Sequence, residues 1–304
     1  MLRIGSRQML RIGSRQPAGA GGAVTRLLST TDHDRGVAGL RYVYAVVSRR
    51  AGGVSIGINL NPNNACNYRC VYCQVPDLVA GRAPAIDRDR LQTELDTFLG
   101  DVVEGGWLER HAPAGSREVR DVAFSGNGEP TSARGFAQIV DLVAASLARR
   151  GLLERVPLRL ITNGSLCHRP TVRDGLERLA AYGGEVWLKV DSVTRAGMAR
   201  INGAPGAAKR LRANVEACAR RCPTWLQSCV FSVDGSGPGE DELGAYLDFV
   251  AGLVTDGVPV RGVLLYTMAR PSMQPEAPRL AALDDDAMAR IAARIEALGV
   301  SCRR

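Results

Sequence analysis

Long apolar runs are missing from this chain of 304 residues. No stretch approaches the roughly 18 consecutive apolar residues that a membrane-spanning helix needs, and the N-terminal residues lack the apolar core of a secretory signal peptide. We therefore expect a cytoplasmic protein with no membrane partner. Eight cysteines without a secretory signal peptide indicate a reducing compartment, where thiols stay reduced, and argue against a disulfide framework.

Acidic residues are absent from residues 1–30, which carry five arginines, so only +3 of the net charge of +8 belongs to the rest of the chain. This distribution weakens the charge as a sign of nucleic-acid binding. Residues 1–8 are repeated identically at 9–16, which indicates a cloning or start-site duplication, with an organelle transit peptide as the alternative. We expect a disordered basic leader over 1–34 and one folded domain over 35–304.

Strand-like and helix-like segments alternate from residue 54 to the C-terminus. The expected strands cover residues 54–60, 119–125, 158–162, 185–191, 225–233 and 258–266. The expected helices cover residues 88–99, 135–149, 172–181, 207–221, 240–254 and 284–298. Six such βα units predict an α/β fold with a parallel sheet and outer helices. Repeated right-handed crossovers curl the sheet into an incomplete (β/α)6 TIM-like barrel.

Polar motifs follow the expected strands at their carboxyl ends. A cysteine-rich segment follows the first strand, Gly-Asn-Gly-Glu-Pro follows the second and Asn-Gly follows the third, and a Lys-x-Asp pair closes the fourth. In barrels of this kind the active site is built on that face. We therefore expect the motifs to surround a single opening at the carboxyl ends of the barrel strands.

Cys66, Cys70 and Cys73 form a C-x3-C-x2-C motif directly after the first strand. Thiolates favour zinc or iron-sulfur clusters over hard cations. A structural zinc site takes four ligands, and a cubane cluster usually takes four cysteines. Three thiolates from one loop therefore predict a metal site with one open position.

These motifs resemble the radical S-adenosylmethionine (SAM) superfamily. The run from Val46 through Cys-Asn-Tyr-Arg-Cys-Val-Tyr-Cys-Gln is similar to the wyosine-type iron-sulfur oxidoreductases, relatives of the enzymes of tRNA-wybutosine synthesis. Ser-Gly-Asn-Gly-Glu-Pro-Thr, Ile-Thr-Asn-Gly-Ser and Trp-Leu-Lys-Val-Asp-Ser extend the likeness over residues 41–204. The wyosine-forming enzymes also use N-terminal cysteines for a second cluster, but no cysteine precedes Cys66 here.

The resemblance implies two cofactors. One is a 4Fe-4S cluster that the three cysteines bind, with one iron left open, and the other is SAM, which binds to that iron. A reduced cluster would cleave SAM to methionine and a 5′-deoxyadenosyl radical, which abstracts a hydrogen from the substrate. An external one-electron donor of the flavodoxin or ferredoxin type would reduce the cluster. The substrate is a tRNA base by resemblance to the branch, with a small metabolite or a peptide as alternatives.

The resemblance also assigns SAM contacts. The SAM contacts include Gly126, Asn127, Gly128, Glu129 and Pro130. Within this run, Asn127 to Pro130 match the Gly-Gly-Glu-Pro element that binds the methionine end, where glycines permit close approach. The alternative for Glu129 is a solvated carboxylate in a strand-to-helix turn.

Four further side chains complete the expected set. Asn163 would contact the methionine carboxylate or the ribose, although Asn-Gly also favours a plain turn. Lys189 would bind the methionine carboxylate and Asp191 the ribose hydroxyls. The alternative is that these two residues, which lie on one face of a strand, form their own ion pair. Tyr72 would pack against the adenine or serve as a core aromatic.

Two alternatives concern metal chemistry more broadly. Cys218, Cys222 and Cys229 could hold a second cluster, although cysteine is commonly buried as a small apolar residue. The whole chain could instead be a non-catalytic metal-binding or RNA-binding module on the same scaffold. That alternative needs a fourth protein ligand near the motif.

Overall fold

The computed structural model describes residues 27–29, 39–48 and 52–304, and its centre is an eight-stranded sheet. The strands, in the order in which they lie side by side, are β1 (Val43–Ser48), β2 (Gly53–Ile58), β5 (Val119–Phe124), β6 (Leu158–Thr162), β7 (Glu185–Lys189), β8 (Thr224–Cys229), β10 (Val260–Tyr266) and β12 (Cys302–Arg303). All neighbouring pairs are parallel except β1 with β2. Two small sheets pair β3 (Ala65–Cys66) with β4 (Val79–Ala80) and β9 (Phe231–Val233) with β11 (Leu280–Ala282).

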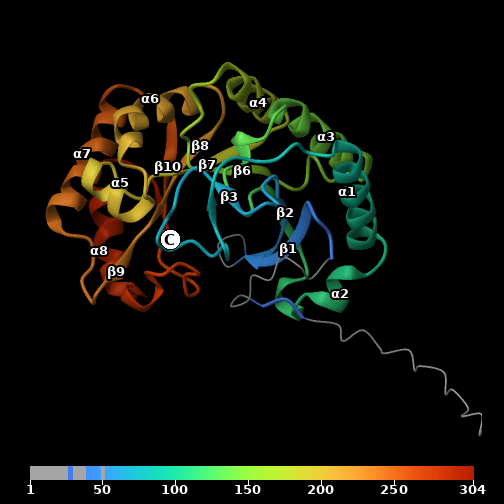
Figure 1. The fold of residues 1–304 in the computed structure, drawn as a ribbon, viewed down its shortest axis with the longest axis horizontal. Helices are drawn as coiled ribbons and strands as arrows, with labels where there is room; N and C mark the ends of the chain where they lie inside the picture. Colours follow the sequence, from blue (N-terminus) through green and yellow to red (C-terminus); the bar gives the residue numbers. More distant parts are fainter. Residues whose placement is uncertain (1–26, 30–38, 49–51) are drawn as a thin grey trace, which may run out of the picture.

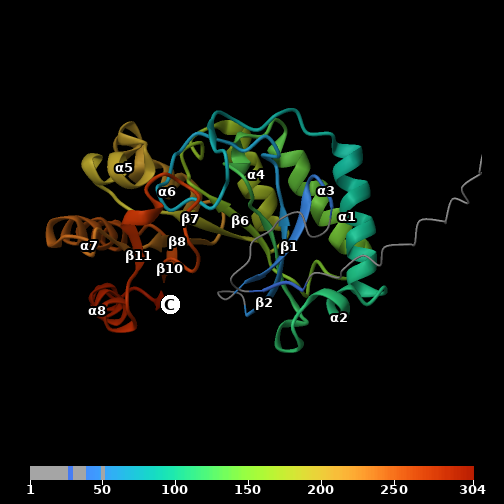
Figure 2. The same cartoon turned by 60° about the horizontal axis from the view of Figure 1, so that its bottom comes forward.

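Helices follow the strands and form an outer layer around the sheet, in an arc that runs from α1 to α8 (Figure 1). They are α1 (Arg88–Val103), α2 (Trp107–His111), α3 (Phe136–Arg149), α4 (Pro170–Ala181), α5 (Arg195–Asn202), α6 (Ala208–Ala219), α7 (Glu240–Thr255) and α8 (Asp285–Glu296). The segment that contains β3 and β4 crosses the carboxyl ends of the strands, on the same side as α5 (Figure 2). Within the described ranges no helix is both long and apolar enough to span a bilayer.

A mixed α/β fold with a mostly parallel central sheet is confirmed, and each expected βα unit is present. Strand β1 was not predicted. It runs antiparallel to β2 and pairs Val43 with Ile58 and Ser48 with Gly53. Helix α5, of eight residues between β7 and α6, was not predicted either. Both omissions have one cause: an expectation of strictly alternating units leaves no place for a hairpin or for an additional helix in a loop.

The two faces of the sheet differ in chemistry because successive side chains of a strand point to opposite faces. On the outer face, apolar side chains such as Ile56, Phe124 and Leu226 join the main core beneath the helices. The Phe124 ring lies edge-on to Phe136 of α3, with 5.7 Å between ring centroids. The inner face carries polar and charged residues, so it differs from the apolar face usual for buried parallel strands.

A network of charged side chains crosses the inner face near the amino ends of the strands. Asp121 of β5 accepts hydrogen bonds from Ser55 of β2 and from Arg159 of β6. The Nε of Arg159 lies 2.8 Å from Oε1 of Glu185 on β7. Glu185 also accepts from Trp225 of β8, through Nε1 at 3.2 Å. These contacts link five strands below the carboxyl-end loops, and we call them the ion-pair floor.

Of the expected leader, the structure describes only residues 27–29. Leu28 is buried in the main core, and its N–H donates to the carbonyl oxygen of His111 at 2.7 Å. The rest of the leader, including the repeated octamer, lies outside the described residues, as do Arg49 and Arg50.

Candidate functional site

The three cysteines of the motif lie in one loop, residues 65–74, at the carboxyl end of β2. Cys66 ends β3, and Cys70 and Cys73 follow in turns, where the N–H of Cys73 donates to the carbonyl of Cys70 at 3.0 Å. All three cysteines are free residues of intermediate exposure, but the thiol groups of Cys66 and Cys70 are themselves largely buried. The loop therefore presents its thiols near a surface that a small molecule can reach.

Two other segments fix this cysteine loop in place. The backbone N–H of Val71 donates to the carbonyl of Ile201 in α5 at 2.9 Å. From the same helix, Asn202 Nδ2 donates to the Cys70 sulfur at 3.3 Å. After β10, the Ser272 hydroxyl donates to the carbonyl of Val71 at 2.7 Å. The loop is thus held from both sides by segments far from it in sequence.

Burial makes the thiols of Cys66 and Cys70 reluctant to ionise without a cation. Desolvation raises the pKa of Cys66 to about 11 and that of Cys70 to about 12. A metal ion reverses this effect, because a coordinating thiol gives up its proton. In the described part of the chain no three Cys, His, Asp or Glu side chains gather closely enough to share a single ion. Cysteines that bind separate irons of a cluster do not need to meet at one point.

The Gly126–Pro130 loop packs directly against the segment that leads into the cysteine loop. A Cβ on Gly126, whose φ is +143°, would lie 2.5 Å from Oδ1 of Asn59, and one on Gly128 would lie 2.7 Å from Cγ of Asn61. Asn59 Oδ1 also accepts from the N–H of Asn127 at 3.1 Å. Both glycines are therefore required by the chain's own packing.

Glu129 is buried, so it is not the solvated turn residue of the alternative interpretation. One carboxylate oxygen accepts from the N–H and hydroxyl of Thr131, at 3.1 and 2.5 Å, and from the hydroxyl of Thr162 at 2.6 Å. The other accepts from the N–H of Asn163 at 2.7 Å. Desolvation raises the pKa of Glu129 and these hydrogen bonds lower it, and the net shift is upward. The carboxylate thus joins the loop after β5 to the end of β6, and Pro130 behind it begins a buried single turn.

Asn163 connects this carboxylate to the cysteine loop. Its Nδ2 donates to Oδ1 of Asn67 at 2.8 Å, and Asn67 lies between the first two cysteines. Its own Oδ1 accepts from the N–H and hydroxyl of Ser165, at 3.0 and 2.6 Å. Asn163 therefore does more than form a turn, because its side chain joins two of the predicted elements.

Asp191 and Tyr72 meet on the opposite side of the cysteine loop. The Tyr72 hydroxyl and Nδ2 of Asn202 both donate to Oδ2 of Asp191, the latter at 2.8 Å. Oδ1 of Asp191 accepts from the N–H of Cys229 at 3.0 Å. The Tyr72 ring packs 5.5 Å from that of Phe231. The Asp191 charge is thus stabilised by neutral donors.

Lys189 and Asp191 do not form the ion pair that the alternative interpretation requires. No carboxylate of the described residues lies within ion-pair distance of the Lys189 ammonium, which donates to the Tyr266 hydroxyl at 3.0 Å and lies 4.9 Å from the Tyr72 ring centroid. Desolvation lowers the pKa of Lys189, but Tyr266 and Asp191 raise it by more, so the amine stays protonated. An ammonium with this surrounding is suited to an anionic ligand group.

The remaining cysteines do not converge on a second site. Cys218 and Cys222 are buried in the main core under the outer helices, whereas Cys229 belongs to a separate cluster with Val71 and Phe231. The Cys222 thiol contacts the carbonyl of Gly184 at 3.5 Å. Their close spacing in sequence therefore does not bring the three thiols together.

Several residues of the site were not predicted. Asn59 and Asn61 belong to an Asn-Leu-Asn-Pro-Asn-Asn run at the end of β2, a polar cluster that could have drawn attention. Asn202 has no comparable signal, since its contacts depend on α5. Tyr266, at the end of β10, could have been found by the same rule that placed the other motifs.

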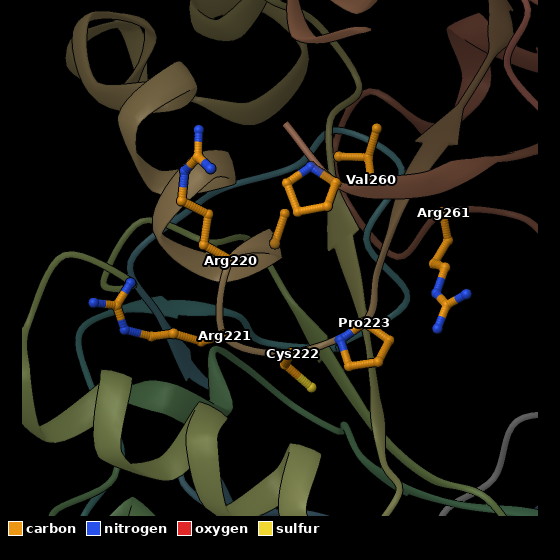
Figure 3. Close-up of a pocket in the computed structure, with 8 residues that line it drawn as sticks. Arg220, Arg221, Cys222, Pro223, Val260 and Arg261 are labelled. Atoms are coloured by element: carbon orange, nitrogen blue, oxygen red, sulfur yellow. The ribbon is translucent and has the colours of Figure 1, made fainter. Parts of the chain in front are cut away.

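A surface hollow at the amino ends of β8 and β10 lies away from this site. It is lined by Arg220, Arg221, Pro223 and Arg261, among others. The three arginine side chains point in different directions (Figure 3). They do not converge on a common ligand.

Comparison with known proteins gives partial matches to curated sequences. The chain is 32% identical over 148 residues, 49% of its length, to a UPF0026 protein of Methanocaldococcus jannaschii, and 25% identical over 163 residues, 53% of its length, to one of Synechocystis. It is 27% identical over 131 residues, 43% of its length, to a protein named GTPase Obg of Brachyspira hyodysenteriae. The aligned parts cover 39%, 52% and 16% of these relatives.

Among solved structures, the cobalamin-dependent S-adenosylmethionine radical enzyme OxsB aligns with a TM-score of 0.41 and 14% identity, over 64% of this chain and 26% of that one. The sequence model of the Radical SAM superfamily matches residues 60–250, more than half of the chain. That range contains the three motif cysteines and the loops after β5, β6 and β7. The chain belongs to the Radical SAM superfamily.

Proposed function

We propose that this protein is a radical SAM enzyme of the wyosine-type branch, built on an incomplete (β/α)6 barrel. The observation that supports it most is the side-chain network around the cysteine loop. Asn163 and Asn67 join the loop to Glu129 on one side, and Asn202 joins Cys70 to Asp191 on the other. Three segments that carry motifs of the superfamily, the loop after β5 and the ends of β6 and β7, are thus connected to the loop that holds the three thiols.

The donor set fits a cluster with one open iron. Cys66, Cys70 and Cys73 supply three soft ligands, and a cation would displace the protons that burial keeps on Cys66 and Cys70. When bound, a 4Fe-4S cluster and SAM supply a 5′-deoxyadenosyl radical that abstracts a hydrogen from the substrate. The protein's own contribution is to bind and orient these groups and to exclude water from around them.

The remaining side chains have distinct proposed tasks. The Lys189 ammonium binds the methionine carboxylate, and Asp191 binds the ribose hydroxyls and orients Tyr72 beside the adenine. Backbone groups of the Gly126–Pro130 loop bind the methionine ammonium. Glu129 and Asn163 position that loop, because their own polar atoms are engaged within the chain.

The partners follow from this chemistry. A flavodoxin-like or ferredoxin-like protein supplies single electrons in the cytoplasm. A tRNA base is the proposed substrate class, in line with the branch resemblance, and a small molecule or peptide is the alternative. If the chain were instead a non-catalytic metal-binding module, it would take zinc through a fourth ligand.

The decisive measurement is SAM cleavage by the anaerobically reconstituted protein. We expect about four irons per chain and release of 5′-deoxyadenosine with dithionite and SAM. Total tRNA should raise the rate and bind at low salt. Equal rates with and without tRNA, together with no binding, would remove the tRNA assignment. Stoichiometric zinc without iron would support the non-catalytic module.

Glu129→Gln tests the positioning role of the carboxylate. The amide nitrogen would face backbone and hydroxyl donors, so we expect a loss of about 2 kcal/mol in unfolding free energy and slower SAM cleavage. Glu94→Gln is the control, since the Glu94 carboxylate accepts from Arg41 and Tyr42 N–H groups at 3.0 and 2.8 Å, away from the site. It should destabilise the fold without slowing cleavage per cluster. Equal cleavage by both variants would contradict the role.

A further inference from the structure

Gln227 of β8 is a buried side chain with no partner for either polar atom. Its exposed fraction is 1%, and neither Oε1 nor Nε2 finds a hydrogen bond among the described residues. Buried amides are normally paired, because an unsatisfied polar group costs free energy. A polar side chain in this state needs partners that the described residues do not supply, and a bound water or a ligand can supply them.

The direction of the Gln227 side chain follows from its strand. Its neighbour Ser228 lies 2.7 Å from the Tyr246 hydroxyl of α7, so Ser228 faces the outer helices. Side chains alternate between faces, so Gln227 faces inward. Its register partners are Lys189 on β7 and Leu264 on β10. Leu264 is only partly buried, so a ligand can reach the amide by displacing the Leu264 side chain.

Gln227 lies between the cysteine loop and the ion-pair floor. Two residues further along β8, the N–H of Cys229 contacts Asp191, which belongs to the proposed SAM contacts. Two residues earlier, Trp225 donates to Glu185 of the floor. Each step of two residues is about 6.6 Å along a parallel strand. The amide is therefore one such step from Asp191, and we expect the substrate to bind on this part of the inner face.

The hydrogen bonds that the Gln227 amide lacks limit the class of ligand that can bind it. The free Nε2 needs an acceptor, and the free Oε1 needs a donor beside it. A carboxylate supplies only acceptors and an ammonium only donors. A primary amide or a lactam edge, as in some nucleobases, supplies both side by side. A trans peptide amide places its donor and acceptor on opposite edges and does not match.

We infer that Gln227 is a substrate-binding residue that recognises a primary amide or lactam edge, an inference that rests on the proposed function. Gln227→Met keeps the shape of the side chain and removes both unpartnered atoms. It should raise the melting temperature of the reconstituted full chain by about 2–4 °C. The control is Gln274→Met. Gln274 is also buried, but its Nε2 donates to the carbonyl of Val75 at 2.9 Å, so its loss should lower the melting temperature.

Ligand binding is measured on the same reconstituted samples by saturation-transfer NMR with small probes. The wild-type chain should bind uracil, 2-pyrrolidone or acetamide, and Gln227→Met should bind them at least tenfold more weakly. Acetate and N-methylacetamide should not bind at the site. Preference for uracil over acetamide would indicate a nucleobase as the source of the edge, and the reverse a primary amide.

Two results would overturn the inference. A lower melting temperature for Gln227→Met would show that the folded chain already satisfies the amide. Absence of wild-type binding to all three matching probes, or binding that the variant retains, would remove the assigned ligand class. A wild-type chain that binds the probes but releases no 5′-deoxyadenosine from SAM would refute the proposed function instead, so the two failures are distinguishable.

Discussion

Cys70→Ala is expected to abolish both the cluster and SAM cleavage. Of the three motif thiols, Cys70 is the one fixed by Asn202, which also binds Asp191. Two remaining thiolates cannot hold a cubane that normally takes four ligands and here has three. Iron per chain should fall close to zero, and 5′-deoxyadenosine should fall to the background of a protein-free reaction.

A matched control separates loss of a ligand from loss of any thiol. Cys302 is also a free, partly exposed cysteine, but it lies in β12 at the edge of the sheet. Cys302→Ala should retain the iron, the brown absorbance and the cleavage rate. Circular dichroism of both variants should match the wild type. A Cys70→Ala protein that keeps its cluster and still cleaves SAM would refute the proposed function.

Much of the fold could be predicted because its signals are local. Apolar strand segments such as 54–60 and amphipathic helices such as 135–149 can be recognised from a few neighbouring residues. The placement rule for parallel strands then grouped the cysteines with Glu129, Asn163 and Asp191. The structure does bring these residues into one connected network.

The individual partners could not be predicted because they depend on side-chain positions between distant segments. Lys189 and Asp191 share a strand face, which suggested an ion pair, yet Asp191 binds Tyr72 and Asn202 while Lys189 donates to Tyr266. Spacing within one strand gives no information about what a neighbouring loop supplies. For the same reason, nothing in the pattern around position 227 distinguishes a satisfied glutamine from an unpartnered one.

The ion-pair floor provides the largest expected effect on stability. Arg159 is the only cation that contacts both Asp121 and Glu185 in the described part of the chain, and its side chain is 16% exposed against 3% for that of Asp121. Removing one partner of a buried ion pair leaves an uncompensated charge and costs about 3–5 kcal/mol. We therefore expect Arg159→Met to lower the unfolding free energy by that amount in urea titrations.

Arg178→Met is the matched control, because Arg178 also contacts two carboxylates, Asp141 and Asp174, but on the surface, where its side chain is 39% exposed. Surface ion pairs contribute little, so this variant should unfold close to the wild type. The floor also bears on function: its contacts join β5, β6, β7 and β8, and β8 carries Gln227, so we expect loss of Arg159 to loosen this part of the inner face. In Arg159→Met, we then expect SAM cleavage to depend less on added substrate. A stability loss no larger than that of Arg178→Met would contradict the stability prediction and show that water already compensates the charge of Asp121.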